Sequence, residues 1–205
     1  GKPRGGGGRG GAGAETGGAV DPGQTGGPGA SGVAGARRVR EKGGAIDPAT
    51  IAVLATFGRA RVRVGARPTV AVLVTGDELV DAAERPRGAQ IRNSNGYAVA
   101  AQAAAAGARV TSLGVVRDEP GPLVEAVRNG LAADALVVSG GVSEGLYDLV
   151  EAALASLGVE ILFDKVSIKP GAPLVFGRHS RGLVFGLPGN PVSAMRMTLD
   201  MMQRK

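Results

Sequence analysis

The sequence predicts an α/β fold, built on a parallel sheet with crossover helices, and three observations support this prediction. From Ala45 onward, apolar runs of strand length alternate with stretches that have the spacing of amphipathic helices. The run 70–74 is apolar without interruption, which is typical of a strand covered on both faces. A second apolar run, 135–139, passes through a glycine pair directly into a helical pattern, which indicates a strand–turn–helix unit.

The amino-acid composition excludes several types of protein and several types of catalytic or binding site. The 205 residues are 43% hydrophobic, which is enough for one buried core and a tail but not for two large domains. The absence of cysteine excludes disulfides, thiolate zinc sites and thiol nucleophiles. Aromatic residues make up only 3%, so recognition of nucleic acid by base stacking is not expected. No apolar run reaches the ~18 residues of a membrane span and no signal peptide is recognisable, so we expect a cytoplasmic protein without a membrane partner.

Glycine and charge set a first boundary in the chain. Residues 1–44 contain 18 of the 36 glycines, and seven basic against three acidic residues. They lack apolar periodicity and aromatic residues, so we expect this low-complexity Gly/Arg-rich segment to be disordered, because it buries too little surface to offset its ordering entropy. The alternative to a plain linker is an arginine-glycine arm for nucleic acid, suggested by Arg4, Arg9 and the basic cluster 37–40.

A lead-in segment is expected over residues 45–67. Asp47 and the proline after it have the pattern of an N-cap and a first-turn proline, which predicts a helix over 48–56. Val62 and Val64 suggest a short strand.

The main domain is expected over residues 68–205. The sequence 93–95 supplies cap candidates for its first helix, and Gly107 ends that helix. The polar turn around 178–181 predicts a hairpin between the last two strands. The predicted strands are 70–74, 109–116, 135–139, 160–168, 173–177 and 183–187, and the predicted helices are 96–106, a helix from 120, 147–157 and a helix from 190 toward the C-terminus.

Residues with useful chemistry follow the apolar runs. In an open α/β sheet, ligands bind beyond the carboxyl ends of the strands, so the residues just after each run are candidate site residues. Asp77 and Glu78 follow the run 70–74 in a small turn with Thr75 and Gly76. Adjacent carboxylates at this position have the chemistry to ligate Mg²⁺. The alternative is a solvated turn in which Asp77 caps the next helix.

The second candidate is the glycine-rich turn after the run 135–139. Paired glycines let the backbone approach an anion closely and two hydroxyls add donors, so phosphate is the expected ligand. Asp148 follows near the start of the next helix, where a carboxylate is expected to hold a metal ion beside that phosphate. A purely structural glycine turn is the alternative. The turn residues concerned are Ser139, Gly140, Gly141 and Ser143.

Two further turns offer a positive charge or free N–H groups to an anion. Lys169 stands beside a Pro-Gly turn, where it is either a fixed cation for an oxyanion or an exposed surface lysine. Asn190 has the position of an N-cap for the last helix, and the unpaired N–H groups and positive dipole end there favour an anion. The residues of this last turn are Pro188, Gly189, Asn190 and Ser193.

Six motifs stand in a fixed order along the main domain, namely residues 75–79, 91–95, 113–118, 139–143 with Asp148, 168–171 and 186–194. Together they resemble the molybdopterin-binding domain of the MoeA/gephyrin family of molybdopterin molybdenumtransferases. The resemblance implies a three-layer α/β/α sandwich with a mostly parallel sheet over residues 68–205. It also implies insertion of molybdenum from molybdate into adenylylated molybdopterin, with Mg²⁺ as the divalent cation and release of AMP.

The resemblance assigns roles to the candidate residues. Asp77 and Asp148 are expected to carry Mg²⁺ at the scissile phosphate, and these two residues with Lys169 form the expected catalytic set. The phosphate is expected to rest on the turn 139–143, Lys169 and Ser193 are expected to hold molybdate, and a homodimer is the expected assembly. The expected substrate-binding residues are Thr75, Gly76, Glu78, Ser139, Gly140, Gly141, Ser143, Pro188, Gly189, Asn190 and Ser193.

Three departures from the family pattern leave alternatives open. Ala172 stands where a second lysine is usual, which removes a charge from the expected molybdate pocket. Asn93 stands where an aspartate is frequent, so a carboxylate role there is lost. The accessory domains that complete the site in that family are not recognisable. The alternatives to the enzyme are therefore a non-catalytic molybdopterin-binding module or truncated fragment, and a molybdopterin adenylyltransferase built on the same domain.

Overall fold

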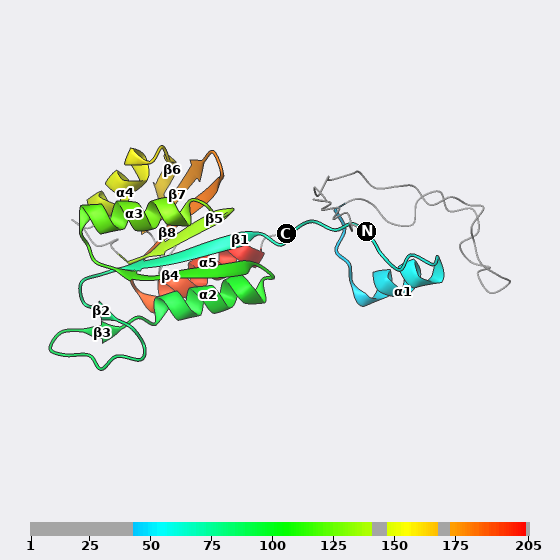
Figure 1. Cartoon of the computed structure of the whole chain (residues 1–205), viewed down its shortest axis with the longest axis horizontal. Coiled ribbons are helices and arrows are strands. Elements are labelled where there is room, and N and C mark those ends of the chain that lie inside the picture. The colour runs from blue at the N-terminus through cyan, green and yellow to red at the C-terminus, as the bar shows by residue number, and fades with distance from the viewer. Residues whose placement is uncertain (1–42, 141–146, 168–172, 204–205) are drawn as a thin grey trace, which may run out of the picture. The chain divides into compact units, whose positions relative to one another are not determined.

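The computed structural model describes residues 43–140, 147–167 and 173–203 (Figure 1). The chain divides into two compact units, residues 1–65 and residues 66–205. The expected disorder and the nucleic-acid arm of the glycine-rich segment fall almost entirely outside the described residues. No helix within the described parts of the chain is long and apolar enough to cross a bilayer.

The helix α1 (Pro48–Thr56) belongs to the first unit. Its predicted N-cap is confirmed, because an Asp47 side-chain oxygen accepts a hydrogen bond from the Thr50 backbone N–H at 2.7 Å. The proline occupies the first turn, where its missing N–H removes no helical hydrogen bond. Phe57 is the C-cap of the helix and stands just before Gly58.

A six-stranded sheet forms the centre of the second unit (Figure 1). Its strand order is β4-β1-β5-β8-β7-β6, and the first four of these strands are parallel. The remaining two, β7 and β6, are each antiparallel to the preceding strand. The strands are β1 (Thr69–Thr75), β4 (Arg109–Val116), β5 (Ala135–Ser139), β6 (Glu160–Lys165), β7 (Pro173–His179) and β8 (Gly182–Leu187).

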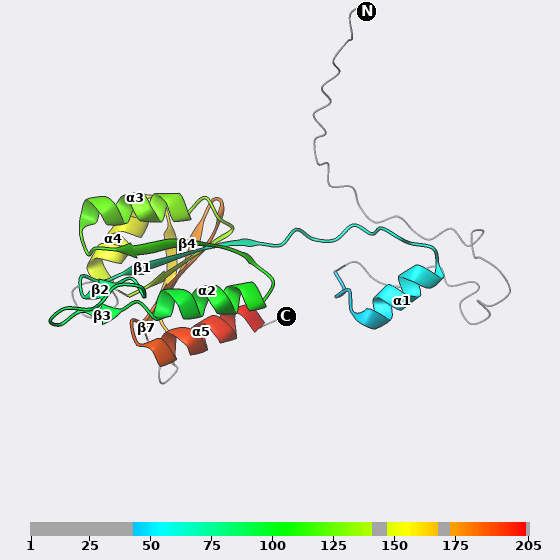
Figure 2. The same cartoon turned by 60° about the horizontal axis from the view of Figure 1, so that its bottom comes forward.

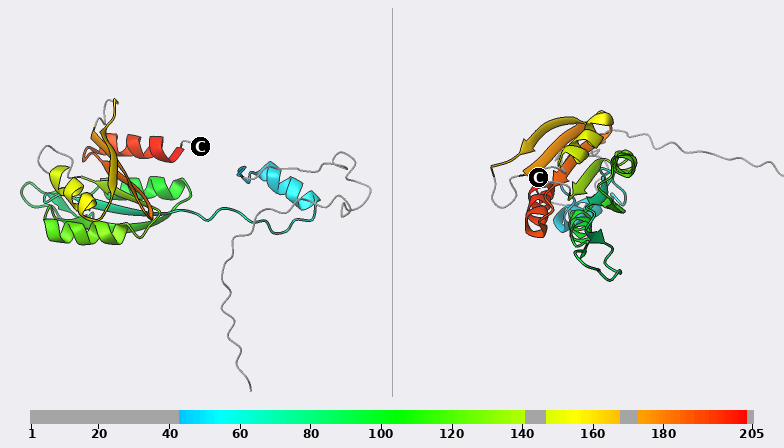
Figure 3. Two further views of the ribbon diagram at one scale, coloured as in Figure 1. Left: turned by 90° about the horizontal axis from the view of Figure 1, so that it is seen from above. Right: turned by 90° about the vertical axis from the view of Figure 1, so that its left-hand side faces the viewer.

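Helices cover both faces of this sheet, so the mostly parallel three-layer fold is confirmed (Figures 2 and 3). α3 (Pro120–Gly130) and α4 (Tyr147–Ser156) lie on one face, and α2 (Asn95–Ala105) and α5 (Pro191–Gln203) lie on the other. The predicted starts of these helices agree with the observed ones to within one residue.

The strand β1 contributes side chains to two hydrophobic cores, because successive side chains of a strand point to opposite faces. Val70 and Val72 pack in the core that α2 and α5 cover. Ala71 and Leu73 pack in the core that α3 and α4 cover. All four are buried. The prediction that the apolar run 70–74 is a strand covered on both faces is therefore confirmed, because β1 lies between two layers of helices.

The structure differs from the sequence-based predictions in three places. The predicted strand at Val62 and Val64 is wrong, since both side chains are exposed and lie in neither helix nor strand. The predicted strand 160–168 is too long, because β6 ends at Lys165. A short parallel pair, β2 (Leu79–Val80) and β3 (Ile91–Arg92), was not predicted, and β2 follows Asp77 where the alternative for Asp77 expected a helix. Two residues are too few to show a period of two, so nothing in the sequence distinguishes this pair from loop.

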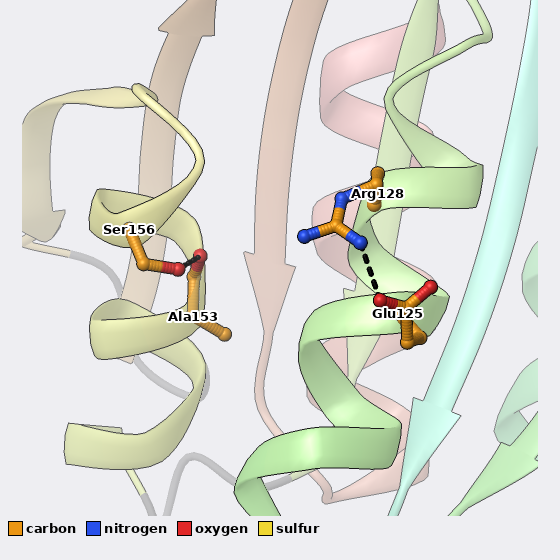
Figure 4. A network of polar contacts seen from close by, with 4 residues as sticks. All are labelled: Glu125, Arg128, Ala153 and Ser156. Atoms are coloured by element: carbon orange, nitrogen blue, oxygen red, sulfur yellow. Dashed lines mark hydrogen bonds and ion pairs between the residues drawn. The ribbon is translucent and has the colours of Figure 1, made fainter.

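The helix α3 makes two kinds of contact. Leu123 is completely buried in the core beneath the helix. Glu125 and Arg128 form an ion pair within one helical turn, and both side chains are more than half exposed (Figure 4). On the neighbouring α4, the Ser156 hydroxyl donates to the Ala153 carbonyl at 2.8 Å (Figure 4).

We expect the buried and the exposed contact of α3 to differ strongly in free energy. Leu123→Ala should lower the free energy of unfolding by about 2–5 kcal/mol, because it removes buried methyl groups and leaves a cavity. Arg128→Ala should change it by no more than about 0.5 kcal/mol, since water screens an exposed ion pair. Urea unfolding followed by circular dichroism measures both values. A larger loss for Arg128→Ala than for Leu123→Ala would contradict the assigned core.

At the amino ends of β1 and β5, the Asp134 carboxylate binds Thr69. One carboxylate oxygen accepts from the Thr69 backbone N–H and from the Thr69 hydroxyl, both at 2.7 Å. The Asp134 backbone N–H donates to the Thr69 hydroxyl oxygen at 3.0 Å. The backbone N–H of Thr69, followed by its hydroxyl, stabilises the charged carboxylate and lowers the pKa of Asp134.

Acid is expected to weaken the fold through this carboxylate. Because the pKa of Asp134 is lower in the folded chain, its contribution to stability is present above the unfolded value of about 3.9 and is lost as the pH falls through the folded value. Asp134→Asn should therefore reduce the decrease of the urea midpoint between about pH 5 and about pH 3. Urea titrations of parent and variant across that range test this, and equal pH slopes would count against it.

Candidate functional site

The carboxyl ends of the four parallel strands lie level at one edge of the sheet. Thr75 at the end of β1 pairs with Val116 of β4, and Ser139 at the end of β5 pairs with Leu187 of β8. Val74 of β1 also pairs with Ser139. Segments far apart in the sequence therefore leave the sheet side by side. We name this edge the rim, and define it as residues 75–78, Asp118, 139–140 and 188–190.

Two carboxylates lie together on the rim beyond β1 and β4. The Asp118 backbone N–H donates to Oδ1 of Asp77 at 3.2 Å. The Thr75 hydroxyl donates to Oδ1 of Asp118. Thr75 is buried, Asp118 is half-buried and Asp77 is exposed. Among the described residues, the second oxygen of each carboxylate has no hydrogen-bond partner, so both remain available to a ligand.

Gly76 and Glu78 shape the turn between these groups. The Gly76 backbone N–H donates to the Val116 carbonyl at 3.3 Å, which holds the turn against β4. The Glu78 carbonyl accepts from the Ile91 backbone N–H at 2.8 Å, at the start of the β2–β3 pair. The side chain of Glu78 is exposed.

Asp118 is a candidate residue that the sequence analysis did not select as a site residue. It stands just beyond β4, as Asp77 stands just beyond β1, so the rule about strand ends applies to it equally. The signal is weaker because β4 is an edge strand, and its side chains are exposed or only partly buried. An edge strand gives no continuous apolar run to mark where it ends.

Gly140 brings the ends of β1 and β5 into close approach. A Cβ atom at this position would lie 2.0 Å from the Thr75 carbonyl oxygen, a distance that no side chain tolerates. Its φ of +99° is also a conformation that favours glycine. Its backbone N–H donates to the Leu187 carbonyl at 3.3 Å. Gly140 therefore joins three strand ends at the rim.

Asn95 connects the two turns on the other side of the rim. Its side-chain Nδ2 donates to the Ser139 hydroxyl oxygen at 3.0 Å and to the Gly189 carbonyl at 2.8 Å. Asn95 is 8% exposed and Ser139 is completely buried. In the sequence, Asn95 is recognisable as a cap candidate and as part of the motif 91–95, but its link between two turns is not, because such a link depends on the tertiary structure.

Asn93 is the residue that caps α2. Its Oδ1 accepts from the Gly96 backbone N–H at 2.9 Å, whereas Ser94 makes no side-chain cap bond. A Cβ at Gly96 would lie 2.7 Å from the Asn93 amide nitrogen and 2.9 Å from a methyl group of Val74. Asn93 therefore helps to start α2, the helix that carries Asn95.

The predicted N-cap of α5 is confirmed at Asn190. Its Oδ1 accepts from the Val192 backbone N–H at 3.0 Å and from the Ser193 backbone N–H at 3.3 Å. Ser193 and Pro188 are buried, whereas Gly189 is exposed. Two of the N–H groups expected to attract an anion are thus already bound by Asn190.

Part of the predicted site lies outside the described residues. Gly141, Ser143, Lys169 and Ala172 belong to the segments 141–146 and 168–172. Asp148 lies in the first turn of α4, and its side chain is not described. Within the described residues, no group of three histidines or acids has the geometry of a metal site.

A family model described as a probable molybdopterin binding domain matches residues 71–204. The chain belongs to this family of molybdopterin-binding domains. The matched residues include the six strands of the central sheet, apart from the first two residues of β1, and all of the rim. The turns at the rim are therefore part of the family fold.

Known relatives agree with this assignment. The chain is 40% identical over 151 residues to a molybdopterin molybdenumtransferase of Bacillus subtilis. It is 41% identical over 154 residues to a protein of the same name from a Nostoc species. Each match covers 73% of this chain and 35% of the relative. The resemblance to the molybdopterin molybdenumtransferase family is thus confirmed, and the chain spans about a third of the length of these relatives.

A solved structure supports the same conclusion. A molybdopterin biosynthesis MoeA protein from Pyrococcus horikoshii superposes with a TM-score of 0.62 at 31% sequence identity. The match covers 71% of this chain and 36% of that chain.

Gly140→Ala is expected to destabilise the molybdopterin-binding domain by about 2–4 kcal/mol, because the added methyl group collides with the Thr75 carbonyl and also strains the backbone. Gly107→Ala is the matched control, since Gly107 has a φ of +96° but no atom within 4 Å of its added Cβ. It should cost about 1–2 kcal/mol from backbone strain alone. Urea unfolding measures both. Equal losses in the two variants would show that the close approach at the rim is not maintained in solution.

Proposed function

We propose that the rim binds molybdopterin, and that this domain supplies the molybdopterin-binding part of a molybdopterin molybdenumtransferase. In that reaction, molybdenum from molybdate enters adenylylated molybdopterin and AMP is released. The observation that carries the proposal is the meeting of two carboxylates and two glycine turns at the ends of four parallel strands. The names of the curated relatives support the choice of substrate.

The glycine turns are the proposed seat of the phosphate. A Cβ at Gly189 would lie 3.8 Å from the Gly140 Cα atom, so the two turns touch without an intervening side chain. Bare backbone of this kind lets a phosphate approach N–H groups closely. In the proposal, Gly141 and Ser143 extend the same turn.

Asp77 and Asp148 are the proposed carriers of Mg²⁺. The donor chemistry at Asp77 fits this ion, because Mg²⁺ prefers hard oxygen ligands and often takes only one or two carboxylates together with phosphate oxygens. When bound, the cation would supply neutralisation of the charge that develops on the leaving phosphate. The Asp118 backbone N–H holds one oxygen of Asp77 and leaves the other available. Asp118 thereby orients Asp77 and adds a second carboxylate at the same corner of the rim.

Lys169 and Ser193 are the proposed contacts for molybdate. Ser193 already gives its backbone N–H to Asn190, so it would bind the oxyanion through its hydroxyl. Ala172, in place of a second lysine, would lower the affinity for molybdate. A homodimer and a cytoplasmic location complete the proposal.

If Asp77 holds Mg²⁺, its replacement should affect AMP release much more than the binding of molybdopterin. Asp77→Ala should leave the dissociation constant of molybdopterin within about threefold and lower Mg²⁺-dependent AMP release from adenylylated molybdopterin by about 100-fold or more, because the cation loses a ligand. Asp148→Ala should behave in the same way. Isothermal titration measures the binding, and chromatography of the released AMP measures the turnover.

Glu84→Ala is the matched control, since it removes an exposed acid from the loop between β2 and β3, and it should change neither quantity. Normal AMP release by Asp77→Ala would overturn the role of Asp77. A parent chain that does not bind molybdopterin would overturn the proposed function itself. Binding without AMP release by the parent would indicate the non-catalytic module instead, and consumption of ATP would indicate the adenylyltransferase.

A further inference from the structure

Asn95 is placed to set the distance between the two turns of the rim. It stands in the first turn of α2, and its Nδ2 binds Ser139 at the end of β5 and Gly189 beyond the end of β8. One amide nitrogen thus holds three elements together at the point where they border the rim. Asn95 and Ser139 are both buried, so the hydrogen bond between them is shielded from competing water, whereas the bond to the exposed Gly189 is part-buried.

The chemistry of the partners fixes the orientation of this amide. The Gly189 carbonyl only accepts hydrogen bonds, so the atom facing it at 2.8 Å must be the nitrogen of Asn95. Both protons of that nitrogen are then used, one on Gly189 and one on the Ser139 hydroxyl oxygen. The Oδ1 atom of Asn95 is left buried with no hydrogen-bond partner in the described part of the chain.

Neither the helix nor the core explains an asparagine at this position. Asn93 already supplies the side-chain cap of α2, so Asn95 is not needed for that purpose. An unpartnered buried oxygen opposes folding, since water no longer satisfies it. The oxygen of the Asn95 side chain therefore opposes folding. Only the two hydrogen bonds that its nitrogen donates, both to turns of the rim, account for an asparagine at this position.

We infer that Asn95 is a positioning residue of the molybdopterin site, which fixes the Ser139–Gly140 turn against the Gly189–Asn190 turn so that both present their backbone to one phosphate. The inference rests on the proposed function. It assigns Ser139 a supporting role as well. Since Ser139 is completely buried and Asn95 is its side-chain partner, Ser139 acts on the ligand through the turn that it anchors.

The test compares two replacements of Asn95 with a matched control. Asn95→Ser removes both amide hydrogen bonds without adding charge, and Asn95→Asp keeps the shape of the side chain but turns a donor into an acceptor. Each should raise the dissociation constant of molybdopterin about tenfold in isothermal titration. Gln102→Glu is the control, because Gln102 on the same helix also donates to a backbone carbonyl, that of Met195 on α5, and also keeps a buried unpartnered oxygen. It should lower the thermal midpoint as the Asn95 variants do, but leave the dissociation constant unchanged.

A double-mutant cycle with Ser139→Ala adds a measurement that a general loss of stability would not affect. Ser139→Ala alone should raise the dissociation constant about threefold, and in the Asn95→Ser background it should add less than about 1.5-fold, because the bond it breaks is already absent. Fully additive effects would overturn the inference. It would also be overturned by tenfold weakening in Asn95→Asp alone, which would indicate charge repulsion, or by equal weakening in Gln102→Glu.

The two proposals fail in different ways. A parent chain without affinity for molybdopterin would overturn the proposed function and the inference together. A parent chain that binds, with both Asn95 variants binding equally well, would overturn the inference and leave the proposed function intact. If neither Asn95 variant folds, Ser139→Ala alone decides, and unchanged binding in that variant would overturn the inference.

Discussion

The close approach of Gly140 to the Thr75 carbonyl is the constraint on which the rest of the rim depends. With no side chain at Gly140, the ends of β1 and β5 come together, and the Gly140 backbone N–H reaches the carbonyl of Leu187. Three strand ends are thereby fixed at one level of the sheet. In the proposed function, a ligand at this edge would meet turns that the sheet itself positions, and this would reduce the ordering entropy lost on binding.

The polar groups of the rim fall into two sets that differ in burial. Thr75, Asn95 and Ser139 are buried, and their hydrogen bonds hold the turns in place. Asp77 and Gly189 are exposed and can meet a ligand directly. This division is typical of a preorganised site, in which buried hydrogen bonds fix the geometry and exposed groups do the binding. In the proposed function, it also accounts for a buried asparagine whose side-chain oxygen has no hydrogen-bond partner among the described residues.

Much of the fold could be predicted from the sequence, because the signals are local. The run 70–74 gave a strand covered on both faces, and Asp47 and Asn190 gave two helix starts by capping chemistry that involves only near neighbours. The prediction failed at Val62 and Val64, where alternation was present but both residues lie in neither helix nor strand. A strand depends on a partner, whereas a helix satisfies its own backbone.

By itself, the sequence determined the order of the helices and of the six strands of the central sheet, the family and the turns that carry the candidate chemistry, because each of these is written in consecutive residues. Only the tertiary structure decided that Asp118 supports Asp77, and that Asn95 joins Ser139 to Gly189. These partners stand 41, 44 and 94 residues apart. A hydrogen bond over such a separation follows from the register of the parallel strands, which places the strand ends side by side, and no local pattern in the chain encodes that register.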